Sequence, residues 1–134
     1  MHPTNTLHID QNLLDIIQER LQSGKLPCAV AFDIAQKNNS SMQSIGQIVN
    51  AENIRFSKCQ LGLFGYSPKN KIIKPIDSVE PELERAINDT KKDNVIQCAQ
   101  IWKISKKLGM KKLHVSCACE TLKLKIKGCQ LGAF

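Results

Sequence analysis

The chain of 134 residues has few aromatic residues, few histidines and few arginines. Aromatic residues make up 4% of the chain, and there are 3 histidines against 19 lysines and arginines taken together. The arginines among these cations are Arg20, Arg55 and Arg85. Because bidentate recognition of guanine relies on arginine, this scarcity argues against strong guanine readout on a nucleic acid.

Motifs of common catalytic sites are also missing. The sequence has no glycine-rich phosphate loop, no pair of histidines with metal-ligand spacing and no Cys-x-x-Cys. His2, His8 and His114 have no nucleophile close to them in the sequence. The sequence does not exclude catalysis by a cysteine nucleophile, but it shows no general base and no orienting group for one. We therefore expect a protein that is not an enzyme.

Long apolar runs are absent as well. Hydrophobic residues make up 42% and charged residues 23%, values typical of a soluble globular protein, and no run approaches the length of a membrane span. The start, MHPTNTLHID, lacks the basic and apolar parts of a secretory signal. We expect a cytoplasmic protein without a membrane partner. In a reducing compartment its 6 cysteines are expected to be free thiols or ligands rather than disulfides.

What the chain does contain is an internal repeat. After a shift of 70 residues, segments 12–64 and 82–134 align without a gap and share 11 identities in 53 positions. The identities gather at apolar, Cys and Gly positions. The longest run of consecutive identical residues is Cys-Gln-Leu-Gly, at 59–62 and 129–132. Duplication of one structural unit produces this pattern. The predicted organisation is a first repeat over 1–65, a linker or wing hairpin over 66–81 and a second repeat over 82–134.

Each repeat shows three helical segments followed by a strand. Apolar residues recur at helical spacing and then alternate with polar ones, while Lys25-Leu26-Pro27 is predicted to be an extended link. Helices are predicted over 10–21, 28–37, 41–50, from 81 onward, 98–108 and 111–122, and strands over 54–58, 71–76 and 124–127. The last strand has no returning partner in its own repeat, so we expect it to lie near 54–58, with the halves related by an approximate twofold.

The spacing within each repeat resembles a helix-turn-helix motif. In that motif an apolar residue and a small one precede a turn, and apolar residues follow six and nine positions after the turn. The matching residues are Ile34, Ala35, Asn39, Ile45 and Ile48 in the first repeat, and Ile104, Ser105, Gly109, Val115 and Ala118 in the second. Asn38 and Ser105 depart from the usual pattern. The resemblance to winged-helix modules implies a mainly α fold with a small β component, an α+β class built from two tandem three-helix units.

Positive charge is concentrated in the second repeat. Of the net charge of +7, residues 1–65 contribute 0, from five basic and five acidic side chains. Residues 66–81 contribute +1, from three and two, and residues 82–134 contribute +6, from eleven and five. A polyanion or an acidic partner is therefore expected to contact the second repeat, although lysines also solvate ordinary exposed helix faces.

The resemblance implies a DNA-binding protein and transcriptional regulator with no cofactor. In helix-turn-helix proteins the second helix enters the major groove by its amino-terminal end. The positions expected to be exposed there are Ser41, Met42, Gln43, Gly46, Gln47 and Asn50, and Lys111, Lys112, Leu113, Ser116, Cys117 and Glu120. Of these, Gln43 and Gln47 are candidates for adenine contacts. Phosphate contacts are expected from Lys103, Lys106, Lys107, Lys111, Lys112 and His114.

Four cysteines occupy matched positions in the two repeats, and their role is either packing or metal binding. Cys28 and Cys98 begin the middle helices, and Cys59 and Cys129 follow the strands, so we expect the two cysteines of each repeat to lie close together. Thiols pack as small hydrophobes, but they also bind zinc and iron–sulfur clusters. The alternatives to DNA binding are a protein-interaction or assembly module, and a cysteine-based metal or redox sensor. A homodimer is a further candidate state.

Overall fold

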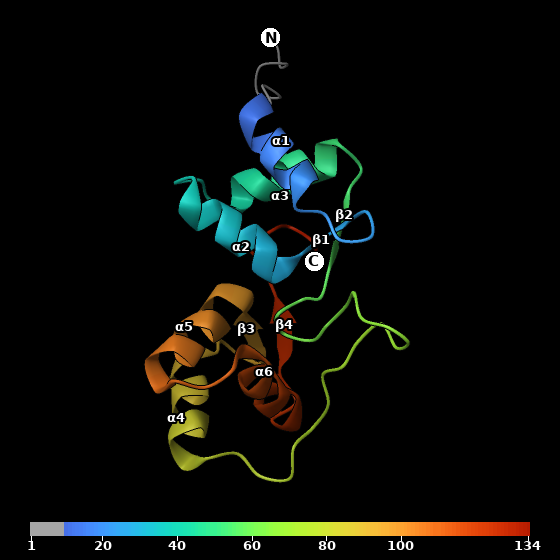
Figure 1. Ribbon diagram of the computed structural model, residues 1–134. Coiled ribbons are helices and arrows are strands. Elements are labelled where there is room, and N and C mark those ends of the chain that lie inside the picture. The colour runs from blue at the N-terminus through green and yellow to red at the C-terminus, as the bar shows by residue number, and fades with distance from the viewer. Residues whose placement is uncertain (1–9) are drawn as a thin grey trace.

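The computed structural model describes residues 10–134, and the same order of elements occurs twice along this part of the chain (Figure 1). The first half contains α1 (Gln11–Glu19), β1 (Lys25–Pro27), α2 (Cys28–Lys37), α3 (Met42–Ala51) and β2 (Arg55–Ser57). The second contains α4 (Pro81–Thr90), β3 (Val95–Gln97), α5 (Cys98–Leu108), α6 (Lys112–Thr121) and β4 (Lys125–Lys127). The fold is mainly helical with short strands, as expected. The predictions on His2, His8 and a secretory signal fall on residues 1–9, outside the described part.

The helices begin and end where local hydrogen bonding predicts. Asp10 caps α1 by accepting a 3.1 Å hydrogen bond from the Leu13 N–H. Ser41 caps α3, where its Oγ accepts a 3.0 Å hydrogen bond from the Ser44 N–H. Helix α5 ends at Gly109, whose φ of 65° is a left-handed conformation that glycine adopts without strain. Caps of this kind satisfy backbone groups that a short helix leaves open, so they fix the register of each helix.

The strands pair within each half, and both pairs are parallel. Leu26 of β1 is opposite Phe56 of β2, and Ile96 of β3 is opposite Ile126 of β4. The expectation that the last strand finds its partner near 54–58 is therefore wrong. Lys25–Pro27, which was expected to be a link, pairs with β2, and Val95–Gln97, for which no strand was expected, pairs with β4. The predicted strand over 71–76 is also wrong, since residues 66–80 contain no strand. The returning strand of a wing hairpin is thus missing from the described residues.

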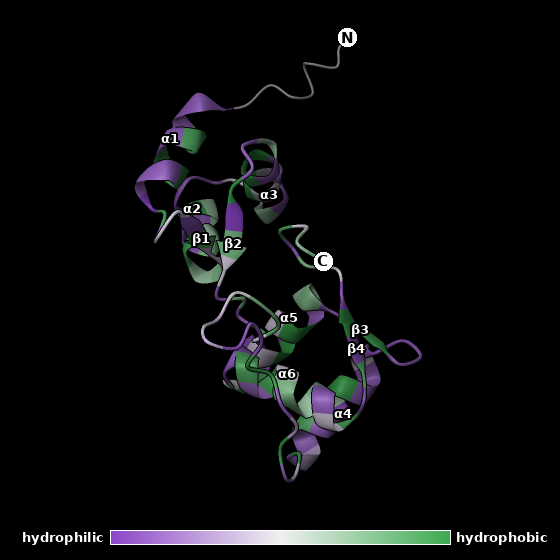
Figure 2. Cartoon of the chain, turned by 90° about the vertical axis from the view of Figure 1, so that its right-hand side faces the viewer, coloured by the Kyte–Doolittle hydropathy of each residue, from purple (hydrophilic) through white to green (hydrophobic). Residues whose placement is uncertain are grey.

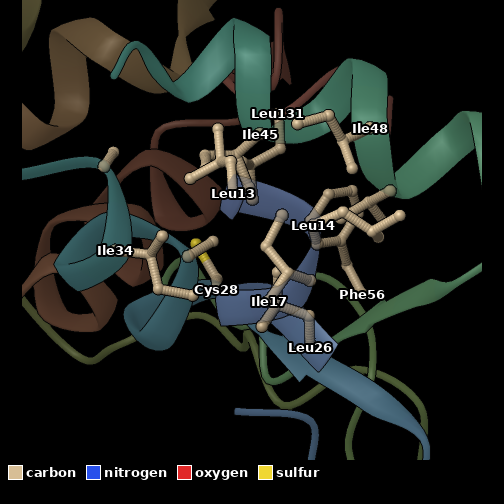
Figure 3. Close-up of a cluster of buried hydrophobic side chains, with 13 residues drawn as sticks. Leu13, Leu14, Ile17, Leu26, Cys28, Ile34, Ile45, Ile48, Phe56 and Leu131 are labelled. Carbon is tan, nitrogen blue, oxygen red and sulfur yellow. The ribbon is translucent and has the colours of Figure 1, made fainter. Parts of the chain in front are cut away.

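Each half has its own hydrophobic core, but each core also contains a segment from the other half. Leu131, from the end of the chain, is 2% exposed and packs with Leu13, Ile45 and Ile48 in the first core (Figure 3). Conversely, Cys59 and Leu61 belong to the second core. We call residues 59–62 and 129–132 the exchanged segments. Their exchange makes the two halves one packing unit.

The exchanged segments rest on the third helix of the opposite half. A Cβ atom added to Gly46 of α3 would lie 2.1 Å from the carbonyl oxygen of Leu131, so the helix and the segment touch through their backbones. The matched position in α6 is Ser116, whose Oγ donates a 2.7 Å hydrogen bond to the Leu61 carbonyl. The 70-residue shift of the repeat relates one pair to the other, since it takes Gly46 to Ser116 and Leu61 to Leu131. The contacts between the halves are therefore reciprocal.

Aromatic side chains complete the contact between the halves. The rings of Phe32 and Trp102 meet edge to face with centroids 4.8 Å apart, and those of Phe64 and Phe134 do so at 6.3 Å. Each pair joins a residue to its own counterpart in the repeat. Figure 2 shows the carboxyl-terminal segment between the two lobes. None of the described helices is both long enough and apolar enough to cross a bilayer.

Candidate nucleic-acid interface

Four of the predicted lysines are exposed on one region of the second half. Lys103, Lys106 and Lys107 are exposed on α5, and Lys111 is exposed directly before α6. In the part of the chain that the structure describes, none of them takes part in an ion pair. Their charges are therefore available to an external anion. With Lys112, at the start of α6, they form what we call the lysine face.

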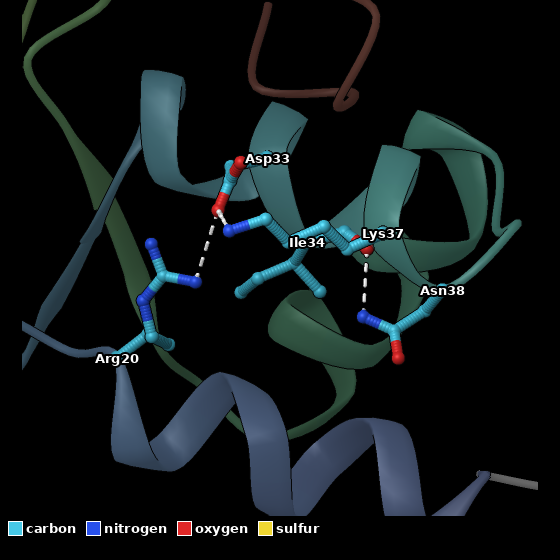
Figure 4. Close-up of polar contacts among 5 residues, drawn as sticks. All are labelled: Arg20, Asp33, Ile34, Lys37 and Asn38. Atoms are coloured by element: carbon cyan, nitrogen blue, oxygen red, sulfur yellow. Dashed lines mark hydrogen bonds and ion pairs between the residues drawn. The ribbon is translucent and has the colours of Figure 1, made fainter.

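On the matched surface of the first half, an acidic residue is paired with the cations. Asp33 of α2 binds Lys37 at 3.1 Å and Arg20 at 3.2 Å (Figure 4). The hydrogen bond from Lys37, followed by that from Arg20, holds the pKa of the Asp33 carboxyl below its ordinary value. By the repeat, Asp33 corresponds to Lys103 and Lys37 to Lys107. The same place in the fold thus carries a paired acid in one half and an additional cation in the other.

The amino-terminal end of α6 is also more positively charged than that of α3. Lys111 occupies the capping position of α6, and its side chain makes no capping hydrogen bond, whereas Ser41 caps α3. The first N–H groups of α6 are therefore not satisfied by a side-chain cap, and helix amino-termini favour anions. Lys112 is half-buried, with its Nζ 4.6 Å from the centroid of the Trp102 ring. This cation–π contact fixes the Lys112 ammonium beside the helix end.

His114 is engaged within the molecule. Its Nε2 lies 3.0 Å from both carboxylate oxygens of Glu80, in the connecting segment before α4. The pKa of the Glu80 carboxyl is lowered, first by the hydrogen bond from its own backbone N–H and then by that from His114. His114 therefore ties α6 to the connecting segment and is not a freely available cation.

Three residues expected to be exposed on the third helices are buried. Gly46 and Ser116 lie under the exchanged segments, and Cys117 of α6 is 7% exposed. For Gly46 and Ser116 the expectation was wrong because the Cys-Gln-Leu-Gly element had no assigned place in the sequence analysis, and it packs on this surface of the third helices. Gln43 and Gln47 are exposed, and they line a shallow groove beside residues 129–132.

The matched cysteines begin the middle helices and the exchanged segments. All six thiols are free. The side-chain amide of Gln130 lies 3.8 Å from the Cys98 sulfur, so the second exchanged segment reaches the start of α5 in its own half. Within residues 10–134, no three Cys, His, Asp or Glu side chains are arranged around the position of a single metal ion.

The candidate interface is therefore the lysine face, supported by an uncapped helix end and differing in charge from its counterpart in the first half. The sequence identified all of its lysines from the resemblance and the charge distribution. It missed the ion pairs of Asp33, although the acid-to-lysine change between the repeats was a signal for them. Comparisons of the chain with protein-family models, with curated proteins and with solved structures found no match.

Proposed function

We propose that the protein binds DNA as a transcriptional regulator, with the lysine face in contact with phosphates. The reversal of charge at matched positions carries the proposal. Asp33 neutralises Lys37 in the first half, but the residue in its place is Lys103, so Lys107 stands beside another cation. Like charges gathered on one exposed helix face destabilise a folded protein slightly, and a polyanion relieves that repulsion.

The position of the lysine face in the fold supports a nucleic acid as the partner. Helices α5 and α6 keep the spacing that resembles a helix-turn-helix, and in this motif the start of the second helix meets the DNA backbone and base edges. Lys111 and Lys112 lie at that start. In this proposal the chain is a pair of tandem helix-turn-helix units without wings. Because the unit is duplicated, a single chain would present two third helices, α3 and α6, to the DNA.

Contacts to phosphate are favoured over contacts to bases in the second half. The middle of α6 is covered, because Ser116 is fully buried against Leu61. Base contacts would fall to Gln43 and Gln47, which are exposed on α3 and can pair with adenine. The expected binding is therefore strongly dependent on salt and only moderately selective for sequence.

A titration followed by NMR tests the proposal. Duplex DNA added to ¹⁵N-labelled full-length protein is expected to shift the amide resonances of α5 and of the first turn of α6, with smaller shifts at Gln43 and Gln47. Polyglutamate serves as a control for charge alone. Equal shifts with polyglutamate would favour an acidic protein partner, and no shift with DNA would contradict the proposal.

A further inference from the structure

The segment that connects the two halves carries a groove with both apolar and basic lining. Residues 66–80 run along one side of the molecule to the start of α4, as a green to yellow trace in Figure 1. A groove of about 740 Å³ lies on this segment, and we call it the connector groove. Its lining includes the apolar residues Leu63, Pro68, Ile72 and Ile73 and the cations Lys69, Lys71 and Lys74.

Hydrogen bonds fasten the connector groove to the fold. The N–H groups of Ile72 and Ile73 both donate to the Gly62 carbonyl, at 2.8 and 3.0 Å. The side-chain oxygen of Asn70 accepts a 2.8 Å hydrogen bond from the Gly65 N–H and so closes the turn before them. Because Gly62 belongs to the first exchanged segment, the groove is held by a part of the chain that packs in the second core.

The chemistry of the connector groove favours a partner that is both apolar and acidic. Ile72 is 39% exposed, and together with Pro68 it offers apolar surface to a partner. Lys69, Lys71 and Lys74 are exposed, and none of them takes part in an ion pair with another described residue. Apolar contact surrounded by complementary charge is the usual composition of a protein interface.

An acidic stretch follows the connector groove directly in the sequence. Asp77, Glu82 and Glu84 are exposed at the end of the connecting segment and in the first turn of α4. Within residues 10–134, no ion pair includes any of these three carboxylates. Pro81, between them, is also exposed. We call residues 77–84 the acidic segment. The cations of the groove and these acids are close along the chain, but they form no ion pair within one molecule.

We propose that the connector groove binds the acidic segment of a second copy of the chain, so that the protein forms a twofold dimer. In such a dimer the same contact occurs twice, because each copy offers its groove to the acidic segment of the other. The three lysines of the groove then face the three free carboxylates, and the exposed ring of Pro81 supplies an apolar group for the groove.

A second copy is favoured over the other possible occupants. The phosphate backbone of a nucleic acid has no apolar group to match the exposed side chain of Ile72. A different acidic protein would satisfy the lysines of the groove but would leave the acidic segment without a partner. The proposal does not depend on the lysine face, since none of the lysines of that face lines the connector groove.

Analytical ultracentrifugation of the full-length protein over a range of concentrations tests this proposal. We expect an equilibrium between monomer and dimer whose dissociation constant rises with salt, since salt screens the contacts between charges. Charge reversal of the groove in Lys69→Glu/Lys71→Glu/Lys74→Glu, or of the acidic segment in Asp77→Lys/Glu82→Lys/Glu84→Lys, brings like charges together. Each triple variant is therefore expected to self-associate at least about tenfold more weakly.

Mixing the two triple variants separates a lost contact from a lost fold. Both contacts of the mixed dimer again join opposite charges, so the equimolar mixture is expected to dimerise although neither variant does so alone. Lys103→Glu/Lys106→Glu/Lys107→Glu reverses the same number of charges at exposed positions of α5 and should leave the dimer unchanged.

A single substitution tests the apolar part of the contact. Ile72→Asp places a carboxylate at an exposed position of the connector groove and is expected to abolish the dimer without affecting the cores. Wild-type protein that stays monomeric at millimolar concentration would overturn the proposal, as would a dimer that Ile72→Asp and both charge reversals leave intact. Binding of a synthetic glutamate-rich peptide in the groove of a monomeric wild type would assign the groove to a different acidic protein and would also overturn it.

Discussion

The Ser116 hydroxyl donates a 2.7 Å hydrogen bond to the carbonyl oxygen of Leu61, 55 residues earlier and in the other half of the fold. At the matched place in the first half, the Leu131 carbonyl lies directly over Gly46. One contact uses a hydrogen bond and the other uses the absence of a side chain. Both place an exchanged segment on a third helix, so the stability of each half depends on residues of the other.

Replacing Gly46 with alanine is expected to destabilise the protein. The new methyl group would overlap the backbone of Leu131, which cannot rotate away as a side chain does. Overpacking of this kind costs about 1–3 kcal/mol in the free energy of unfolding. Urea denaturation followed by Trp102 fluorescence measures the loss. Gln47→Ala, at the next and exposed position, is the control, and equal stability of the two variants would refute the close contact.

Removing the Ser116 hydroxyl is expected to weaken the opposite contact. Ser116→Ala leaves the buried carbonyl of Leu61 without this donor, which costs about 1–3 kcal/mol. The same denaturation assay applies, with Ser78→Ala in the exposed connecting segment as the matched control. If the two variants unfold at the same urea concentration, the hydrogen bond contributes nothing to the association of the halves.

A substitution near the carboxyl terminus is expected to destabilise the first half of the fold. Leu131→Ala removes a side chain that is 2% exposed in the first core, and substitutions of this kind cost about 2–5 kcal/mol. Hydrogen exchange measured by mass spectrometry should show faster exchange in α1 and α3 than in α4. Faster exchange confined to the second half would contradict the exchange of segments.

Alkaline conditions are expected to destabilise the fold through the buried thiol of Cys119. Burial raises the pKa of Cys119 from 9.0 to about 12, so between these values the unfolded chain loses a proton that the native protein keeps. Stability therefore falls as pH rises through this window. Cys119→Val, which introduces the residue found at position 49, should reduce the loss measured by denaturation under reducing conditions at pH 8 and pH 10. An unchanged loss would place the titration elsewhere.

The helices could be predicted from the sequence because their signals are local. Asp10, Ser41 and Gly109 mark helix ends by their own chemistry, and the apolar spacing between such ends selects the buried face. The pairing of the strands was not predictable in the same way. Alternation indicated strands over 54–58 and 124–127, where β2 and β4 lie, but it did not show their partners. Leu26 pairs with Phe56 across 30 positions, and the segment of Leu26 was expected to be a link.

No periodic pattern in the sequence predicts the exchange of segments either. The repeat marked Cys-Gln-Leu-Gly as important, but an alignment of two halves does not show whether Leu61 packs on its own helix or on the opposite one. The lysine face was predictable because charge is a property of composition and most of its side chains stay exposed. The burial of Gly46 and Ser116 depended on the unpredicted contact, so the exposed surface of the third helices was overestimated.

The dependence of DNA affinity on salt tests the functional account most directly. The logarithm of the association constant for a fluorescent duplex should fall steeply with the logarithm of salt concentration, and Lys111→Ala/Lys112→Ala should reduce the slope by up to about two units, roughly one for each phosphate contact. Lys25→Ala/Arg55→Ala removes the same charge from exposed positions of the first half and should leave the slope nearly unchanged. A slope near zero for the wild-type protein, or equal slopes for the two double variants, would contradict DNA binding through the lysine face.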